Sequence, residues 1–72
     1  MCGIIGIISN KPVSSAIINS LRKLEYRGYD SSGIATLSDG LINEVKSEGK
    51  LDNLEKNPAI KNMLGNLGIG HV

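Results

Sequence analysis

The hydrophobic pattern of the chain changes its period after the first few residues. Residues 3–9 are mostly isoleucine and glycine without polar alternation, which is typical of a strand buried on both faces. Ser9, Asn10 and Pro12 then supply residues that favour the start of a helix. Apolar positions from Val13 to Leu24 form one helical stripe. The first third of the chain therefore predicts a strand followed by an amphipathic helix.

The middle of the chain predicts a hairpin. Residues 26–33 break the helical pattern and predict a loop or tight turn. Residues 33–37 and 41–45 are β-prone runs, and the sequence Ser-Asp-Gly at 38–40 between them is a turn signal. We therefore expect two antiparallel neighbouring strands here.

The last third is polar and helical before it returns to a strand. Leu51 and Leu54 fit one turn, Pro58 interrupts, and an amphipathic pattern continues to Leu67. Residues 68–72 have strand character again. This order of elements is typical of an α+β fold, and the last strand has no successor to cover its edge. We therefore expect residues 1–72 to be the N-terminal part of a larger domain.

Composition and charge exclude several function classes. The chain of 72 residues is 40% apolar with no Trp or Phe, so its core is aliphatic. A net charge of +1, with both signs interspersed, gives no support for a nucleic-acid or anionic-membrane partner. The apolar runs are too short to span a bilayer. A lone cysteine fits a reducing compartment, so we expect a cytoplasmic protein.

Cys2 is the candidate nucleophile. It directly follows Met1, so removal of Met1 would leave a thiol and a free α-amine on one residue. Such an amine has an unperturbed pKa of about 7.7–8.0 and can accept a proton near neutrality. A rigid strand behind Cys2 would hold the thiol in place. Free cysteines are also common as inert packing residues, so both interpretations stay open for this residue taken alone.

Arg27 and Gly28 are the second candidates. The forked donors of an arginine suit a carboxylate, and a glycine permits close backbone approach. The alternative is a structural turn in which Asp30 pairs with Arg27. His71, the only histidine, is an alternative base for Cys2, as in papain-like enzymes, although a lone histidine near a strand end is more often structural.

The sequence gives little support for a metal site or for a phosphate-binding loop. One cysteine and one histidine are too few ligands for a zinc site. The glycines at 65, 68 and 70 lack the spacing of a phosphate-binding loop. They are more typical of backbone crowding around a strand.

Two segments together resemble a known family. Residues 1–6 (MCGIIG) and 21–35 (LRKLEYRGYDSSGIA) are similar to the start of a class II glutamine amidotransferase domain, an N-terminal-nucleophile fold with four αββα layers. Residues 25–31 resemble the branch that uses fructose 6-phosphate to form glucosamine 6-phosphate, although Val72 stands where threonine is usual. The alternatives are an amidophosphoribosyltransferase-like enzyme and a non-catalytic fragment that acts only as an interaction piece.

The resemblance assigns roles to particular residues. It implies that Cys2 attacks the side-chain amide of L-glutamine, and that Arg27 and Gly28 frame the nucleophile and its amine, with Gly3 and Tyr29 as supports. It implies no metal or redox cofactor, and a homodimer of the complete enzyme. It also implies that the oxyanion hole, the glutamine-binding residues and the sugar isomerase domain lie beyond residue 72. Residues 1–72 alone are therefore expected to be inactive.

Overall fold

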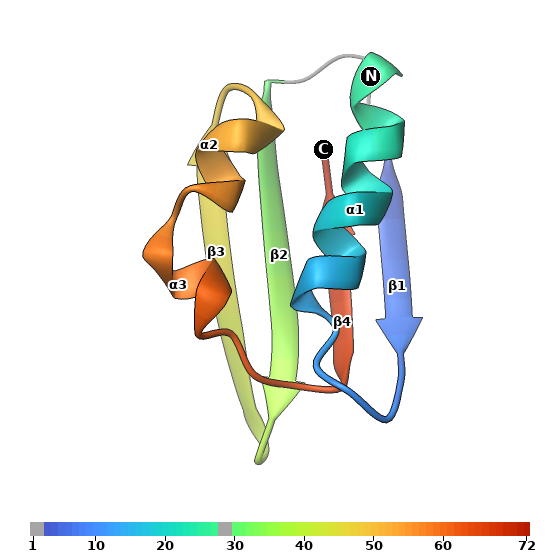
Figure 1. Cartoon of the computed structure of the whole chain (residues 1–72), viewed down its shortest axis with the longest axis vertical. Coiled ribbons are helices and arrows are strands. Elements are labelled where there is room, and N and C mark those ends of the chain that lie inside the picture. The colour runs from blue at the N-terminus through green and yellow to red at the C-terminus, as the bar shows by residue number, and fades with distance from the viewer. Residues whose placement is uncertain (1–2, 28–29) are drawn as a thin grey trace.

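Helices cover one face of a single antiparallel sheet in the computed structural model, which describes residues 3–27 and 30–72 and, at Arg27, only the backbone (Figure 1). The strand order within this part of the chain is β1-β4-β2-β3. The strands are β1 (Ile4–Ile8), β2 (Ser31–Ser38), β3 (Leu41–Glu48) and β4 (Leu67–His71). The helices are α1 (Ser14–Leu24), α2 (Leu51–Glu55) and α3 (Pro58–Lys61), with a 3-10 turn, η1, at Glu25–Arg27. The predicted α+β class is confirmed.

The predicted stripe forms the buried side of α1. Val13, Ile17 and Leu21 are at most 1% exposed and Leu24 packs against the same core, whereas Ala16 is exposed and Ile18 is buried in addition (3%). The helix begins at Ser14, one residue from the predicted start, but the predicted capping is wrong, because no side chain caps α1. The Val13 amide instead donates to the Gly65 carbonyl (3.0 Å). A tertiary contact therefore holds the end that local capping was expected to hold.

Glycines in β4 let α1 lie directly on the sheet. A Cβ added at Gly70 would lie 2.5 Å from Ile17 Cγ2, and one at Gly68 would lie 2.8 Å from Ile17 Cδ1. Both positions are buried. Side chains there would push the helix outward. The predicted backbone crowding around this strand is confirmed.

The predicted hairpin is longer than its sequence pattern. Strands β2 and β3 pair from Ser31↔Glu48 to Ser38↔Leu41, several residues beyond the expected runs. Asp39 and Gly40 make the turn with φ of 53° and 77°, a backbone that suits a two-residue hairpin connection. Residues 31–33, which were expected to lie in the preceding loop, belong to β2 instead.

The helical turn predicted at residues 51–54 and the helical segment predicted after it are present as the two short helices α2 and α3. Pro58 is the first residue of α3, and Asn57 caps that helix by accepting a hydrogen bond from the Ala59 amide (3.0 Å). The helical pattern predicted to reach Leu67 is wrong, since α3 ends at Lys61. Thr36 Oγ1 donates to the Leu64 carbonyl (2.6 Å) and fixes the following segment on the sheet. No described helix has the length and apolarity needed to cross a bilayer.

The sheet has one covered face and one helix-free face. Burial alternates along β1, with Ile4 81% and Ile8 78% exposed while Ile5 and Ile7 pack against the core. The expectation that this strand is buried on both faces is therefore wrong for the structure described, because nothing covers its second face. The large apolar side chains on the helix-free face are Ile4, Ile8, Leu37, Ile42, Leu67 and Ile69.

Candidate active site

The start of β1 is anchored to the end of β4. The Gly3 amide donates to the Val72 carbonyl (3.2 Å), and the Val72 amide donates to the Gly3 carbonyl (3.0 Å). Cys2 itself lies outside the described residues. Its immediate neighbour Gly3 is nevertheless fixed by two hydrogen bonds at the sheet end. The strand support expected behind the nucleophile is present.

Close packing brings the end of α1 to the same place. A Cβ added at Gly3 would lie 3.0 Å from Leu24 Cδ1 and 3.3 Å from Leu24 Cβ. A side chain at position 3 would require Leu24 to shift by a few tenths of an ångström. The turn η1, which contains the Arg27 backbone, follows Leu24 directly. The structure thus places the start of β1, next to Cys2, beside the end of α1, which leads into the turn with Arg27 (Figure 1).

The predicted site residues lie largely outside the described groups. Gly28 and Tyr29 are outside the described residues, as Cys2 is, and only the backbone of Arg27 is described. Their proposed contacts therefore stay predictions. Asp30 is described, and its carbonyl accepts a hydrogen bond from the Gly49 amide (2.9 Å).

His71 packs against β2. It lies opposite Ile4 and Gly33 in the strand register, on the helix-free face. A Cβ added at Gly33 would lie 2.6 Å from His71 Nε2 and 3.1 Å from Lys46 Cγ. The imidazole therefore occupies the space above a glycine. This arrangement favours the structural interpretation of His71 over its interpretation as a base.

A hollow of about 330 Å³ lies beside His71 at the ends of β2 and β3. Its lining includes Ser31, Ser32 and Lys46, and the buried Ser32 hydroxyl has no hydrogen-bond partner among the described groups. His71, the alternative base for Cys2, is part of this lining. The described residues also contain no cluster of three His, Cys, Asp or Glu side chains placed to hold a metal.

Ionic contacts connect α1 to α2. Arg22 pairs with Asp52 Oδ1 (3.0 Å) and with Glu55 on the outer surface of the two helices. The hydrogen bond to Asp52 raises the pKa of the Arg22 guanidinium, with further contributions from the charges of Glu55 and Glu25. Arg22 therefore stays charged at all working pH values. This contact fixes α2 beside the last turns of α1.

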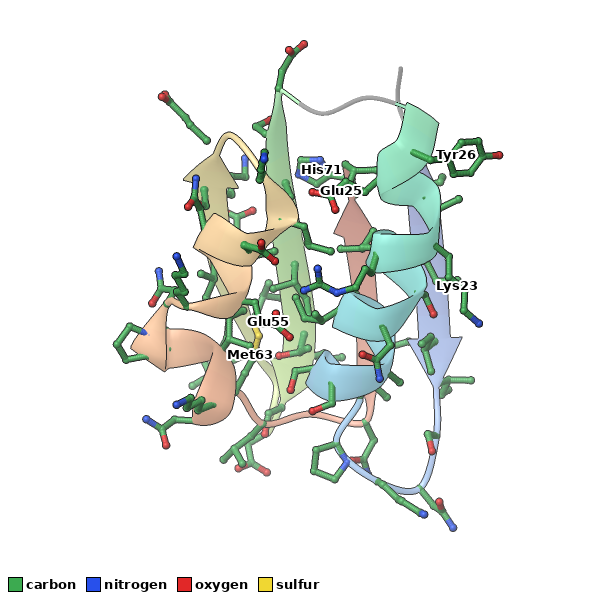
Figure 2. All side chains as sticks on the ribbon, turned by 45° about the horizontal axis from the view of Figure 1, so that its top comes forward. Lys23, Glu25, Tyr26, Glu55, Met63 and His71 are labelled. Carbon is green, nitrogen blue, oxygen red and sulfur yellow. The ribbon has the colours of Figure 1, made fainter. Side chains whose placement is uncertain are left out.

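Glu25 is a connection that the sequence pattern did not indicate. Its Oε2 accepts a hydrogen bond from the Leu51 amide (2.9 Å) at the start of α2. In Figure 2 the Glu25 side chain turns inward, whereas Tyr26 and Lys23 point away from the molecule. Lys50 was the one indication in the sequence. It precedes α2 and gives that helix no side-chain cap, so an acceptor for the Leu51 amide has to come from elsewhere.

Comparisons with known proteins give high identity to one enzyme. The glutamine--fructose-6-phosphate aminotransferase [isomerizing] of Bartonella henselae is 54% identical over 71 residues, which are 99% of this chain and 12% of that protein. The protein of the same name from Brucella abortus is 55% identical, and one from Rhizobium meliloti is 48% identical, over the same shares. The chain thus spans about an eighth of the length of these relatives. No family model matches the chain.

A solved structure supplies the fold comparison. The glutamine phosphoribosylpyrophosphate amidotransferase of B. subtilis, complexed with ADP and GMP, matches 100% of this chain with a TM-score of 0.87. The match covers 16% of that protein, at 22% identity, and shows a shared fold. Over its 71 matched residues, the chain is homologous to the N-terminal 12% of the glutamine--fructose-6-phosphate aminotransferases.

Proposed function

We propose that this chain is the N-terminal part of the glutaminase domain of a glutamine–fructose-6-phosphate aminotransferase. The observation that carries the proposal is the identity of 54–55% over 99% of the chain to proteins of that name. The amidophosphoribosyltransferase alternative has weaker support, because its structural counterpart is only 22% identical. The complete protein would use L-glutamine and fructose 6-phosphate and form glutamate and glucosamine 6-phosphate.

Cys2 is the proposed nucleophile. After removal of Met1, the α-amine takes the thiol proton, and sulfur attacks the carbonyl carbon of the glutamine side chain. The tetrahedral intermediate collapses as the protonated amine returns its proton to the leaving nitrogen, which releases ammonia and leaves a γ-glutamyl thioester. Water then hydrolyses the thioester to glutamate and restores the thiol. The paired hydrogen bonds between Gly3 and Val72 support this role, since they fix the backbone that carries Cys2.

Arg27 and Gly28 are proposed to frame the nucleophile and the substrate. The contact between Gly3 and Leu24 supports this assignment, because it brings the end of α1 to the start of β1. The Arg27 guanidinium would offer a carboxylate paired donors, which a lysine cannot do in the same geometry. Gly28 would leave room for the close approach of another backbone.

The helix-free face supports the proposal that residues 1–72 are part of a domain. Ile8, Leu67, Leu37 and Ile42 are opposite one another in register and form an apolar row across the sheet. An exposed apolar face of this kind is normally buried against a second layer of secondary structure. We propose that a second sheet covers it and completes the αββα arrangement. The oxyanion hole, the glutamine-binding residues and the sugar isomerase domain would belong to the same longer polypeptide.

The complete enzyme is proposed to be a cytoplasmic homodimer without a metal or redox cofactor. Its ammonia would pass internally from the glutaminase domain to the sugar half. The absence of a metal requirement follows from the mechanism itself, since the amine of Cys2 supplies the base.

Covalent labelling of a chimera tests this function. In the chimera, this chain replaces the matching 71 residues of the Brucella abortus relative. We expect 6-diazo-5-oxo-norleucine to add one label to the N-terminal peptide at Cys2, detected by peptide mass spectrometry. The 72-residue chain alone should stay unlabelled, whether or not Met1 is removed. An unlabelled but folded chimera would overturn the proposal.

Ile69→Lys distinguishes the partial domain from a free-standing interaction piece. Ile69 is 63% exposed, so in the 72-residue chain this change should alter the free energy of unfolding by less than about 0.5 kcal/mol. In the chimera, the covering sheet would bury the ammonium, and the loss should exceed about 1 kcal/mol. Thermal and urea unfolding of both proteins measure the difference. Equal effects in the two proteins would favour the interaction piece and an uncovered face.

A further inference from the structure

Both ends of the segment that contains Arg27 are bonded to the same short stretch of chain. On one side, the Leu51 amide donates to Glu25 Oε2 (2.9 Å). On the other, the Gly49 amide donates to the Asp30 carbonyl (2.9 Å). The Gly49–Leu51 segment thus holds residues 25 and 30 at once, although it is far away in sequence.

The backbone of Gly49 is suited to this arrangement. Its φ of 82° lies in the left-handed region, and an added Cβ would lie 2.9 Å from Asn53 Nδ2. That amide group donates to the Glu48 carbonyl (3.1 Å), so it has little freedom to move away. The chain therefore turns sharply at Gly49, between the end of β3 and the start of α2. This turn presents the Gly49 amide to Asp30 and the Leu51 amide to Glu25.

The Glu25 carboxylate is the side-chain element of this connection. Glu25 follows α1 and opens η1, so its side chain fixes the turn at the point where the chain leaves the helix. Lys50 precedes α2 and gives it no side-chain cap. Glu25, which is far away in sequence, supplies the acceptor for the first amide of that helix. The acceptor is a carboxylate, which makes the bond charge-assisted and stronger than a neutral one.

We propose that Glu25 is a positioning residue for glutamine hydrolysis, acting through the Gly49–Leu51 segment to hold the turn that carries Arg27. This inference rests on the proposed function of Cys2 and Arg27. Glu25 itself touches no substrate in this account. It sets the backbone at one end of the Arg27 segment, while the Gly49 amide sets the other end.

The first test uses amide hydrogen exchange in the 72-residue chain. Glu25→Ala should speed exchange of the Leu51 amide by about tenfold or more, because the amide loses its acceptor. Glu25→Gln keeps an oxygen at the same reach and should restore most of the protection. Asn57→Ala is the matched control, since it removes the cap that Ala59 uses in α3 and leaves Glu25 in place. Unchanged exchange at Leu51 in Glu25→Ala would overturn the inference.

The second test measures glutaminase kinetics in the chimera. Glu25→Ala should lower kcat/KM for glutamine by about tenfold at a temperature where all variants are folded, through misplacement of the Arg27 turn. Glu25→Gln should stay within about threefold of the unsubstituted chimera, and Asn57→Ala should match it. Equal losses in Glu25→Ala and Asn57→Ala would show a merely structural role and overturn the inference.

Failure of the inference and failure of the proposed function give different results. If the proposed function is wrong, the unsubstituted chimera folds but releases no glutamate, and the exchange measurement on Leu51 still decides whether Glu25 holds the turn. If only the inference is wrong, the chimera is active and loses its activity with Cys2→Ala, whereas Glu25→Ala keeps full kcat/KM.

Discussion

Replacing Cys2 with alanine is expected to lower glutamine hydrolysis by the chimera by a factor on the order of 10⁴ or more, as for other hydrolases that lose their nucleophile. Cys2 is the only cysteine that this chain contributes. Its removal takes away the atom that forms the thioester, and water must then attack the amide directly. Glutamate release, followed with a coupled dehydrogenase assay, measures the loss. A variant that retains wild-type turnover would show that the nucleophile lies elsewhere.

An N-terminal extension tests the α-amine separately from the thiol. Two residues placed before Cys2 keep the sulfur but turn the amine into an amide, which cannot accept a proton. We expect this protein to be as inactive as Cys2→Ala, while its thermal unfolding stays close to that of the unextended chimera. Full activity in the extended protein would assign the base to another group. His71→Asn would then be the next variant to measure.

The double substitution Gly68→Ala with Gly70→Ala is expected to destabilise the 72-residue chain by about 2–6 kcal/mol, since overpacking costs about 1–3 kcal/mol at each site. Added methyl groups would lie 2.8 and 2.5 Å from the side chain of Ile17, which is fully buried between α1 and the sheet. A domain of 72 residues has a total stability of roughly 4–11 kcal/mol, at about 0.05–0.15 kcal/mol per residue. The double variant should therefore lose about half of the chain's stability, which urea denaturation would show as a lower midpoint.

Gly6→Ala is the matched control for these two glycines. It lies in the neighbouring strand β1, but an added Cβ there has its nearest neighbours at 3.8 Å (Ile69 Cγ2) and 3.9 Å (Gly68 carbonyl oxygen). These are ordinary contacts. We expect a change within about 0.5 kcal/mol, or a small gain from a less flexible unfolded chain. A loss as large as that of the double variant would mean that strand glycines matter here for reasons other than the approach of α1.

Local patterns in the sequence were sufficient to predict most of the elements. The stripe in α1 and the hairpin turn at Asp39 and Gly40 each depend on residues close together in the chain, where periodicity and turn chemistry act directly. The crowding at Gly68 and Gly70 was also predictable, because glycines in a strand indicate close approach. The resemblance of residues 21–35 to a known family then gave the expected position of the site.

Contacts between distant parts of the chain escaped prediction. The start of α1 depends on the Gly65 carbonyl, and Glu25 depends on the Leu51 amide, so neither contact appears in a local pattern. The prediction that β1 is buried on both faces was also wrong for the structure described. Its isoleucines indicate two buried faces whether or not a second layer covers the helix-free face. The chemistry of Cys2, Arg27 and Gly28 comes from resemblance and stays a prediction that the labelling experiment tests.

The helix-free face has a consequence for the synthesis of the protein. If the chain opens a polypeptide as long as its relatives, of which it covers 12%, most of that polypeptide is still to be translated when residues 1–72 fold. At about 5–20 residues per second, completing it takes on the order of tens of seconds. Until the proposed covering sheet has been made and has folded, Ile4, Ile8 and Ile69 remain open to neighbouring nascent chains and to chaperones. The yield of folded protein in a cell therefore depends on these isoleucines as well as on the residues at the proposed active site.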